Sequence, residues 1–437
     1  MRSSTQTLLT GGSIAAVAVT SLTVFTGHQV KETSAFRYES FKQGQMAKQS
    51  VNCPKAISYF TQVKETASFP FNAFDGLTDL AQQQIAICDA FMTANQQATQ
   101  AKQQGNLSKA LVISSTFVEQ YPSDELTKAT RSSITALFGN YKLVKLAGIE
   151  SCDRVDNLVN AKVIPNAKSN TPLFYYSCGQ FYAKRGQNEQ ELGQYRRFLT
   201  FAPRHSLSPN VQKAAVKNAN MCSQTSTFQS IPAIAKLPSF MAVVDMNCSM
   251  AYYNAIDYPQ SREFLKSLRK NYPKHSLAKV ANNWLFSINQ EIKTVKSEIF
   301  NSGETIKAKM IRCTTVGAFV GSAVDIMESL TGKSCGLEEP LEGWQRVVNI
   351  IPWAGEVRGA GKAKRLYDLI QVTSRWQGID KMQSAVQDDE ALFALLKDSE
   401  MITLLTRHNQ KLEQLVMPRL NQPIDTSKNT QFLSYLK

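Results

Sequence analysis

The sequence has 437 residues, enough for two or three domains, and its apolar fraction of 43% is ordinary for a globular protein. This composition excludes a chain that is disordered throughout and a multi-span membrane protein. The net charge of +14 makes anionic envelope surfaces one class of partner to consider. Basic residues gather only at 262–279 and 358–375. We interpret both clusters as solvated helical faces, with an anionic binding patch as the alternative; neither is a long polybasic run, so no nucleic-acid partner is expected.

The first residues have the pattern of an export signal. Residues 3–27 carry no charge, and the apolar run at 8–27 is preceded by Arg2. The run approaches the roughly 20 residues that span a bilayer, and no A-x-A cleavage site follows it. We favour a retained anchor in residues 1–27 over a cleaved signal peptide, and both alternatives stay open. Residues 28–50 are polar and are interpreted as a linker that leads to a periplasmic or extracellular body.

The cysteines reveal an internal repeat with a constant offset. The intervals 152–178 and 222–248 each join two cysteines and are equal in length, so position 152 corresponds to 222 and position 178 to 248. The motif Pro-x-His-Ser-Leu occurs at 203–207 and again at 273–277, at the same offset. Agreement at this many positions is not expected by chance, so we interpret the segments as copies of one structural module.

Each copy has the periodicity of a helical hairpin. Gly186 is expected to break the chain between two helices, and Pro203 to end the second one. Ser206 and Ser276 then stand where the next helix needs an N-cap. The apolar and small residues of the first helix recur at i, i+3, i+4 and i+7, the spacing of one helical face. They are Tyr175, Cys178, Gly179 and Tyr182.

The copies resemble the tetratricopeptide repeat, although they are longer than that family's repeat. An earlier copy, with its cysteines at 53 and 88, is stretched relative to the later two. The resemblance implies a helical-repeat domain at 51–300, whose stacked helices would offer a concave surface to a peptide or a partner helix. The residues that carry it are Tyr175, Cys178, Gly179, Tyr182, Gly186, Tyr195, Phe198 and Pro203 in the second copy, Ala98, Ala101, Gly105, Ala110, Phe117 and Pro122 in the first, and Tyr252, Leu265, Leu268 and Pro273 in the third.

The eight cysteines predict four disulfides within an exported chain. An even number suits pairing in an oxidising compartment, and no C-x-x-C pair or zinc-ligand spacing is present. If every copy is its own module, the pairs are local, and eight buried thiols are the alternative. The predicted pairs are Cys53 with Cys88, Cys152 with Cys178, Cys222 with Cys248, and Cys313 with Cys335. We expect no metal and no cofactor.

Residues 301–365 contain Gly321, Asp325, Glu328, Thr331, Gly332, Lys333, Gly343, Trp344 and Arg346. Through these residues the segment resembles the pre-toxin TG domain of bacterial polymorphic toxins. The resemblance implies a small helical domain between an export or repeat region and a toxin, although few residues follow it here. A phosphate-binding loop at Thr331-Gly332-Lys333-Ser334 is excluded, because Met327 stands where that loop needs glycine.

The tail, residues 366–437, has a helical pattern that Pro418 ends. We expect its helices to pack on the preceding domain, with a membrane-active tail as the alternative.

Taken together, the sequence predicts an all-α protein without catalytic residues. No paired carboxylates, metal cluster or nucleophile with a base can be placed, which argues against an enzyme such as a wall-modifying hydrolase. The leading hypothesis is an exported scaffold that binds a protein or peptide partner in the envelope or outside the cell. The alternative is a secreted effector or toxin-delivery component.

Overall fold

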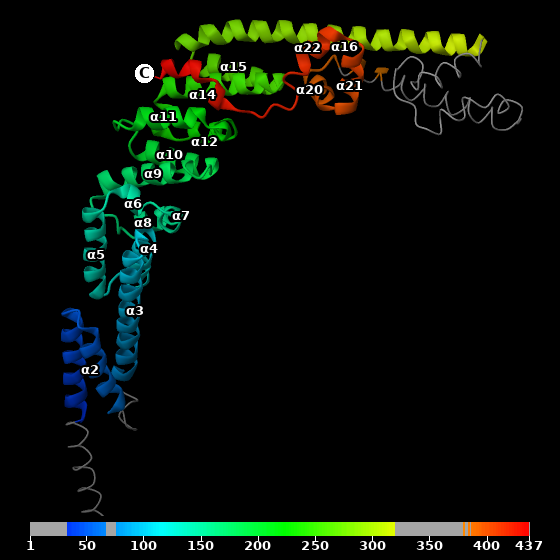
Figure 1. Ribbon diagram of the computed structural model, residues 1–437. Coiled ribbons are helices and arrows are strands. Elements are labelled where there is room, and N and C mark those ends of the chain that lie inside the picture. The colour runs from blue at the N-terminus through cyan, green and yellow to red at the C-terminus, as the bar shows by residue number, and fades with distance from the viewer. Residues whose placement is uncertain (1–32, 67–75, 320–378, 381–382, 385, 437) are drawn as a thin grey trace, which may run out of the picture. The chain divides into compact units, whose positions relative to one another are not determined.

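The computed structural model describes residues 33–66, 76–319, 379–380, 383–384 and 386–436. All regular secondary structure within these ranges is helical, which confirms the predicted all-α class (Figure 1). The chain forms two compact units, residues 1–201 and 202–437.

The helices of each unit follow one another with short connections. The first unit contains α2 (Cys53–Glu65), α3 (Leu77–Gln103), α4 (Leu107–Gln120), α5 (Leu126–Asn140), α6 (Leu143–Leu146), α7 (Ile149–Asp153), α8 (Val155–Asn160), α9 (Ala167–Ala183) and α10 (Asn188–Phe201). The second contains α11 (Ser208–Lys217), η2 (Ala219–Gln224), α12 (Thr225–Gln229), α13 (Pro232–Ala235), α14 (Pro238–Asn254), α15 (Tyr258–Asn271), α16 (Ser276–Phe319), α20 (Asp389–Lys397), α21 (Ser399–Arg407), α22 (Gln410–Val416), η4 (Thr426–Lys428) and η5 (Thr430–Tyr435).

The described part of the expected polar linker, residues 33–49, is helical and belongs to the core of the first unit. Phe41 packs on Phe60 of α2, with ring centroids 5.4 Å apart. Lys48 is buried and forms an ion pair with Asp124, whose side chain is also largely buried. The linker interpretation is therefore corrected: polar residues can enter a core when a partner satisfies them, and their partners here are distant in sequence.

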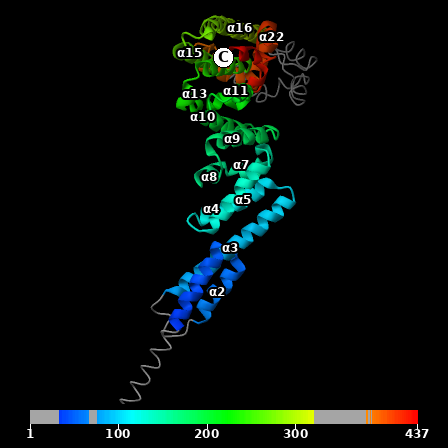
Figure 2. The same cartoon turned by 90° about the vertical axis from the view of Figure 1, so that its left-hand side faces the viewer.

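Three helical hairpins recur along the chain: α3–α4, α9–α10 and α14–α15. The second helix has 14 residues in all three, and α10 and α15 begin and end at positions related by the repeat offset. Figures 1 and 2 both show α9 beside α10. The connection places one residue in the left-handed region in every copy: Gly105 (φ 77°), Gly186 (φ 68°) and Ile256 (φ 63°). Ile256 is buried, and this burial offsets the strain of a β-branched residue in that conformation.

The turn after each hairpin is also the same in the three copies. The Nδ1 atoms of His205 and His275 accept hydrogen bonds from the backbone N–H groups of the leucines two residues later, at 3.1 and 3.2 Å. In the first copy the carboxylate of Asp124 accepts from the backbone N–H of Leu126 at 3.0 Å. The side chain of His or Asp, rather than that of the expected serines, therefore fixes the turn before the next helix, because its acceptor reaches the backbone N–H two residues ahead.

Two of the predicted disulfides are present within the described residues. Cys152 of α7 is bonded to Cys178 of α9, and Cys222 of η2 is bonded to Cys248 of α14. In both copies the bridge joins a short helical segment to the first helix of the hairpin that follows.

The first cysteine pair differs from its prediction. Cys53 and Cys88 are buried and unbonded, with their thiols in hydrogen-bond contact. This contact, together with burial, raises the pKa of the Cys53 thiol. The two residues pack as small apolar side chains between α2 and α3. Cys335 and the motif residues at 321–346 lie outside the described residues, and Cys313 lies where the side chains of α16 are not described.

The second unit shows that the predicted boundary at residue 300 falls inside one helix. α16 runs for 44 residues, from Ser276 to Phe319, without interruption. Gly303 does not break it; a Cβ at this position would approach Gln383 Nε2 to 2.9 Å, so the glycine allows the chain after residue 378 to pack closely. No proline occurs between 276 and 319, and the helix therefore continues across the expected domain border.

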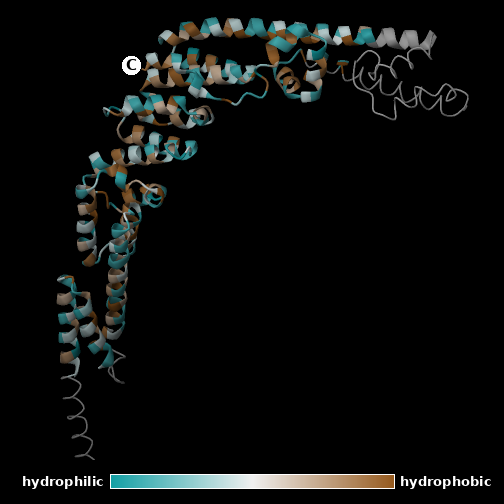
Figure 3. Cartoon of the chain, viewed as in Figure 1, coloured by the Kyte–Doolittle hydropathy of each residue, from teal (hydrophilic) through white to brown (hydrophobic). Residues whose placement is uncertain are grey.

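The tail helices at 389–416 pack on α15 and α16 of the second unit. Arg262 of α15 and Lys296 of α16 both pair with Asp389 at the start of α20. Lys411 of α22 contacts Glu298 of α16 at 2.6 Å. In the described part of the chain no helix is long and apolar enough to cross a membrane. Figure 3 shows hydrophilic and hydrophobic residues mixed along the long helices.

Candidate binding cleft in the second hairpin

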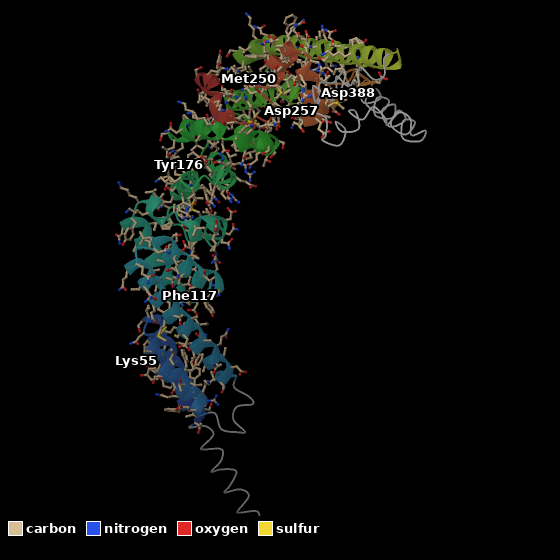
Figure 4. The ribbon with its side chains drawn as sticks, turned by 45° about the vertical axis from the view of Figure 1, so that its right-hand side comes forward. Lys55, Phe117, Tyr176, Met250, Asp257 and Asp388 are labelled. Carbon is tan, nitrogen blue, oxygen red and sulfur yellow. A yellow bond between two sulfur atoms is a disulfide. The ribbon has the colours of Figure 1, made fainter. Side chains whose placement is uncertain are left out.

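A cleft lies beside the Cys152–Cys178 bridge, between the short helices α7 and α8 and the hairpin α9–α10. Its volume is about 240 Å³. Residues from four helices line it: Cys152, Asp153, Val155, Asp156, Tyr182, Gln190, Gly193, Gln194 and Arg197. The disulfide fixes α7 against α9 and so holds the two walls together. Figure 4 labels Tyr176, which lies on this hairpin and packs against Tyr195 and Phe198 of α10.

Two tyrosine–carboxylate pairs lie at the cleft, and Asp153, Asp156 and Tyr182 of these pairs line it directly. Tyr182 donates its hydroxyl hydrogen to Asp153, and Tyr175 donates to Asp156 at 2.8 Å. Arg197 forms an ion pair with Asp156 and lies over the ring of Tyr175. Burial and the neighbouring carboxylates raise the pKa of both tyrosines, so their hydroxyls stay protonated and their hydrogens stay committed to the carboxylates.

The floor of the cleft carries a buried amide with an unused acceptor. Gln194 is only 6% exposed. Its Nε2 atom donates to the carbonyl of Cys152 at 3.5 Å, while its Oε1 atom has no hydrogen-bond partner among the described residues. A buried amide oxygen without a partner is unfavourable by about 1–3 kcal/mol, and a ligand that donates a hydrogen bond would remove this penalty.

Gly193 leaves the mouth of the cleft open. A Cβ placed on Gly193 would meet no atom within 4 Å. The other glycine of the hairpin has a different role: a Cβ on Gly179 would lie 2.3 Å from the Tyr195 ring. Gly179 therefore sets the close approach of α9 and α10, whereas Gly193 leaves space that a side chain could fill.

The third copy has a different set of residues at the equivalent positions. At the repeat offset, Gln194 corresponds to Phe264, whose ring stacks on Tyr252 with centroids 5.5 Å apart. Tyr252 corresponds to Tyr182. The two cleft carboxylates correspond to serines: Asp153 to Ser223 and Asp156 to Ser226. The same frame thus has an aromatic stack in one copy and an acceptor-lined cleft in the other.

A second, wider cleft of about 470 Å³ lies beside the α4–α5 turn, and it is lined in part by Arg131 and Lys162. The guanidinium of Arg131 already donates to the carbonyls of Ala161 and Lys162, at 3.1 and 2.6 Å. Its main donor is therefore used within the protein, which makes this cleft the weaker candidate.

Two buried polar clusters in the second unit serve packing rather than chemistry. Glu291 accepts from Tyr258 at 2.7 Å, pairs with Arg419, and also accepts from Tyr253. Asp245 is fully buried, and this burial raises its pKa to about 7 despite a hydrogen bond of 2.9 Å from Ser267. A carboxyl enclosed in this way cannot reach a substrate in solution.

No group of His, Cys, Asp and Glu in the described ranges is arranged to hold a metal ion. Comparisons with protein-family models, with curated proteins and with solved structures found no match. Of the cysteines that the sequence singles out, Cys152 borders the cleft directly. The carboxylates and Gln194 had no sequence signal of their own, although the change from Phe264 to Gln194 between two copies of the repeat is visible in the alignment of the copies.

Proposed function

We propose that the protein is an exported, non-enzymatic scaffold that binds a protein or peptide partner in the cell envelope or outside the cell. The observation that carries the proposal is the altered second copy: within a repeated, disulfide-stapled frame, it has an open cleft with an unused acceptor. Helical repeats of the tetratricopeptide kind commonly keep their frame and vary the residues that meet a partner. The two disulfides are compatible with an oxidising compartment.

A photo-crosslinking amino acid at position 193 tests this proposal directly. The full chain carrying the crosslinker is produced in its native cells and irradiated. We expect a discrete adduct to a protein partner, because Gly193 opens onto the cleft. The matched control places the same crosslinker at Gly139 of α5, where a Cβ also meets no atom within 4 Å. Equal adducts from both positions, or none from position 193, would contradict a partner site at the cleft.

A secreted effector or toxin-delivery component is the second candidate, supported by the resemblance of residues 301–365 to the pre-toxin TG domain. The two candidates differ in the effect of the chain on cells. The scaffold proposal predicts normal growth when the full chain is produced with or without residues 1–27. Growth arrest that depends on residues 301–437 would favour the effector.

A further inference from the structure

We propose that the cleft beside Cys152 receives a cationic side chain, the ammonium of lysine or the guanidinium of arginine, from the partner's chain. The inference rests on the proposed function and specifies the chemistry of its binding site.

Two hydrogen-bond acceptors of the cleft are not used by the described residues. Asp153 uses Oδ1 for Tyr182, and no described residue donates to its Oδ2. The Oε1 atom of Gln194 is unused as well. The tyrosine hydroxyl hydrogens already point to carboxylates, and the guanidinium of Arg197 is paired with Asp156. A ligand that offers donors and no acceptor matches these groups, and lysine and arginine are the side chains with that property.

The charge of the lining points the same way. Two carboxylates and one guanidinium line the cleft, whereas the whole chain carries +14. The overall charge repels cations, so a cation that binds must be held by local contacts rather than by general attraction. Cation binding is therefore expected at this cleft and not elsewhere, since the net positive charge of the chain opposes it at other places on the surface.

The size of the cleft favours one side chain over a larger ligand. Its volume of about 240 Å³ is below the range of roughly 300–1,000 Å³ that is usual for small-molecule pockets. The third copy supports a dedicated site, because Ser223, Ser226 and Phe264 stand there in place of Asp153, Asp156 and Gln194, so both cleft carboxylates and the buried amide are absent from their equivalent positions.

The test uses the oxidised full chain and two probes that differ in one charged group. N-acetyl-lysine methylamide and N-acetyl-norleucine methylamide share an alkyl stem, and only the first has an ammonium. Ligand-detected NMR titrations should show saturable binding of the lysine probe and binding at least about tenfold weaker for norleucine. We expect Gly193→Phe, which fills the cleft, to weaken lysine binding at least about tenfold, and Gly139→Phe to leave it unchanged.

Asp153→Asn provides a second, smaller change. Its amide oxygen can still accept from Tyr182, so the fold is kept while the negative charge is lost, and lysine binding should again fall about tenfold. Equal binding of the two probes, or lysine binding that survives Gly193→Phe, would overturn the inference. An adduct at position 193 without lysine binding would leave the scaffold proposal intact and refute only the ligand class. Lysine binding without any adduct would refute the scaffold proposal instead.

Discussion

Gly179 and Tyr195 set the distance between the two helices of the second hairpin. Gly179 has no Cβ, and the ring of Tyr195 occupies the space where one would lie. The equivalent pair in the third copy is Ser249 and Leu265, at the repeat offset. The larger residue at one position thus occurs with the smaller residue at the other. Ser249 uses its extra atoms for a hydrogen bond of 3.0 Å to Ser261.

We expect Gly179→Ala to destabilise the protein by about 1–3 kcal/mol, because the added methyl would overlap the Tyr195 ring. Combining it with Tyr195→Leu, which recreates the pairing of the third copy, should recover part of this loss. Chemical denaturation of the wild type, both single variants and the double variant measures the coupling. A double variant whose destabilisation equals the sum of the two single effects would refute the pairing.

Asp245 makes the second unit sensitive to pH. Burial raises its pKa from 3.8 to about 7. A folded-state pKa above the unfolded one means that the folded protein binds the extra proton, so stability is fully present below about pH 4 and is lost as pH rises through about 7. At 1.36 kcal/mol per pKa unit the loss is at most about 4 kcal/mol.

Asp245→Asn mimics the protonated side chain and should remove this dependence. Thermal unfolding at pH 5 and pH 8 should show the variant more stable than the wild type at pH 8, with a much smaller difference at pH 5. A variant that is less stable than the wild type mainly at pH 8 would mean that the folded protein favours the charged form of Asp245.

At the level of elements, the turn that ends each hairpin has the same hydrogen bond in all three copies, and the side chain that accepts it is histidine or aspartate. An imidazole nitrogen accepts the backbone N–H two residues ahead in two copies, and the carboxylate of Asp124 does so in the first. His205→Ala should therefore lower stability by about 1 kcal/mol, the usual net value of a lost hydrogen bond, and His205→Asp should lower it clearly less. The unfolding midpoints of the two variants measure this difference. Equal losses of stability would show that the imidazole is needed for packing rather than as a hydrogen-bond acceptor.

The two disulfides also join helices: α7 to α9, and η2 to α14. Each spans a sequence separation of 26, for which the chain-entropy model gives about 3 kcal/mol. Changing Cys152 and Cys178 together to Ser should lower the stability by about this amount and loosen α7. Changing Cys53 and Cys88 together to Ser should leave the loss of stability caused by a reductant unchanged. Peptide mapping without reductant checks the pairs, and a Cys178–Cys222 peptide would refute the modular scheme.

The hairpins and their turns could be predicted from the sequence because their signals are local. Gly186, Pro203 and the cysteine intervals lie within one copy, and the proline and the interval recur in the next. The cleft could not be predicted, because Asp153, Asp156 and Gln194 come from different helices and meet only after folding. The burial of Lys48 was missed for the same reason: its partner, Asp124, is distant in the sequence.

At the scale of the whole chain, Arg419 ties the end of the second unit to its hairpin. The guanidinium pairs with Glu291 and lies 4.7 Å from the centre of the Tyr253 ring. Arg419→Met leaves the partly buried Glu291 without its cation, and we expect the stability to fall by about 3 kcal/mol. Limited proteolysis should then cut between 420 and 437 sooner than in the wild type. Glu291→Gln together with Arg419→Met should restore part of the protection, and equal cleavage in all three proteins would show that other contacts hold the tail.

The turns after α10 and α15 have the same geometry in two successive copies. The turns that begin at Pro203 and Pro273 have the same hydrogen bonds. The segment between these two prolines is therefore joined to the chain through the same turn at both ends. Removing residues 204–273, or inserting a second copy of them, leaves the local turn at each joint unchanged. Each inserted segment also brings its own pair of cysteines. The protein can therefore be lengthened or shortened in whole modules, and relatives produced by unequal duplication should differ from it by whole multiples of this segment.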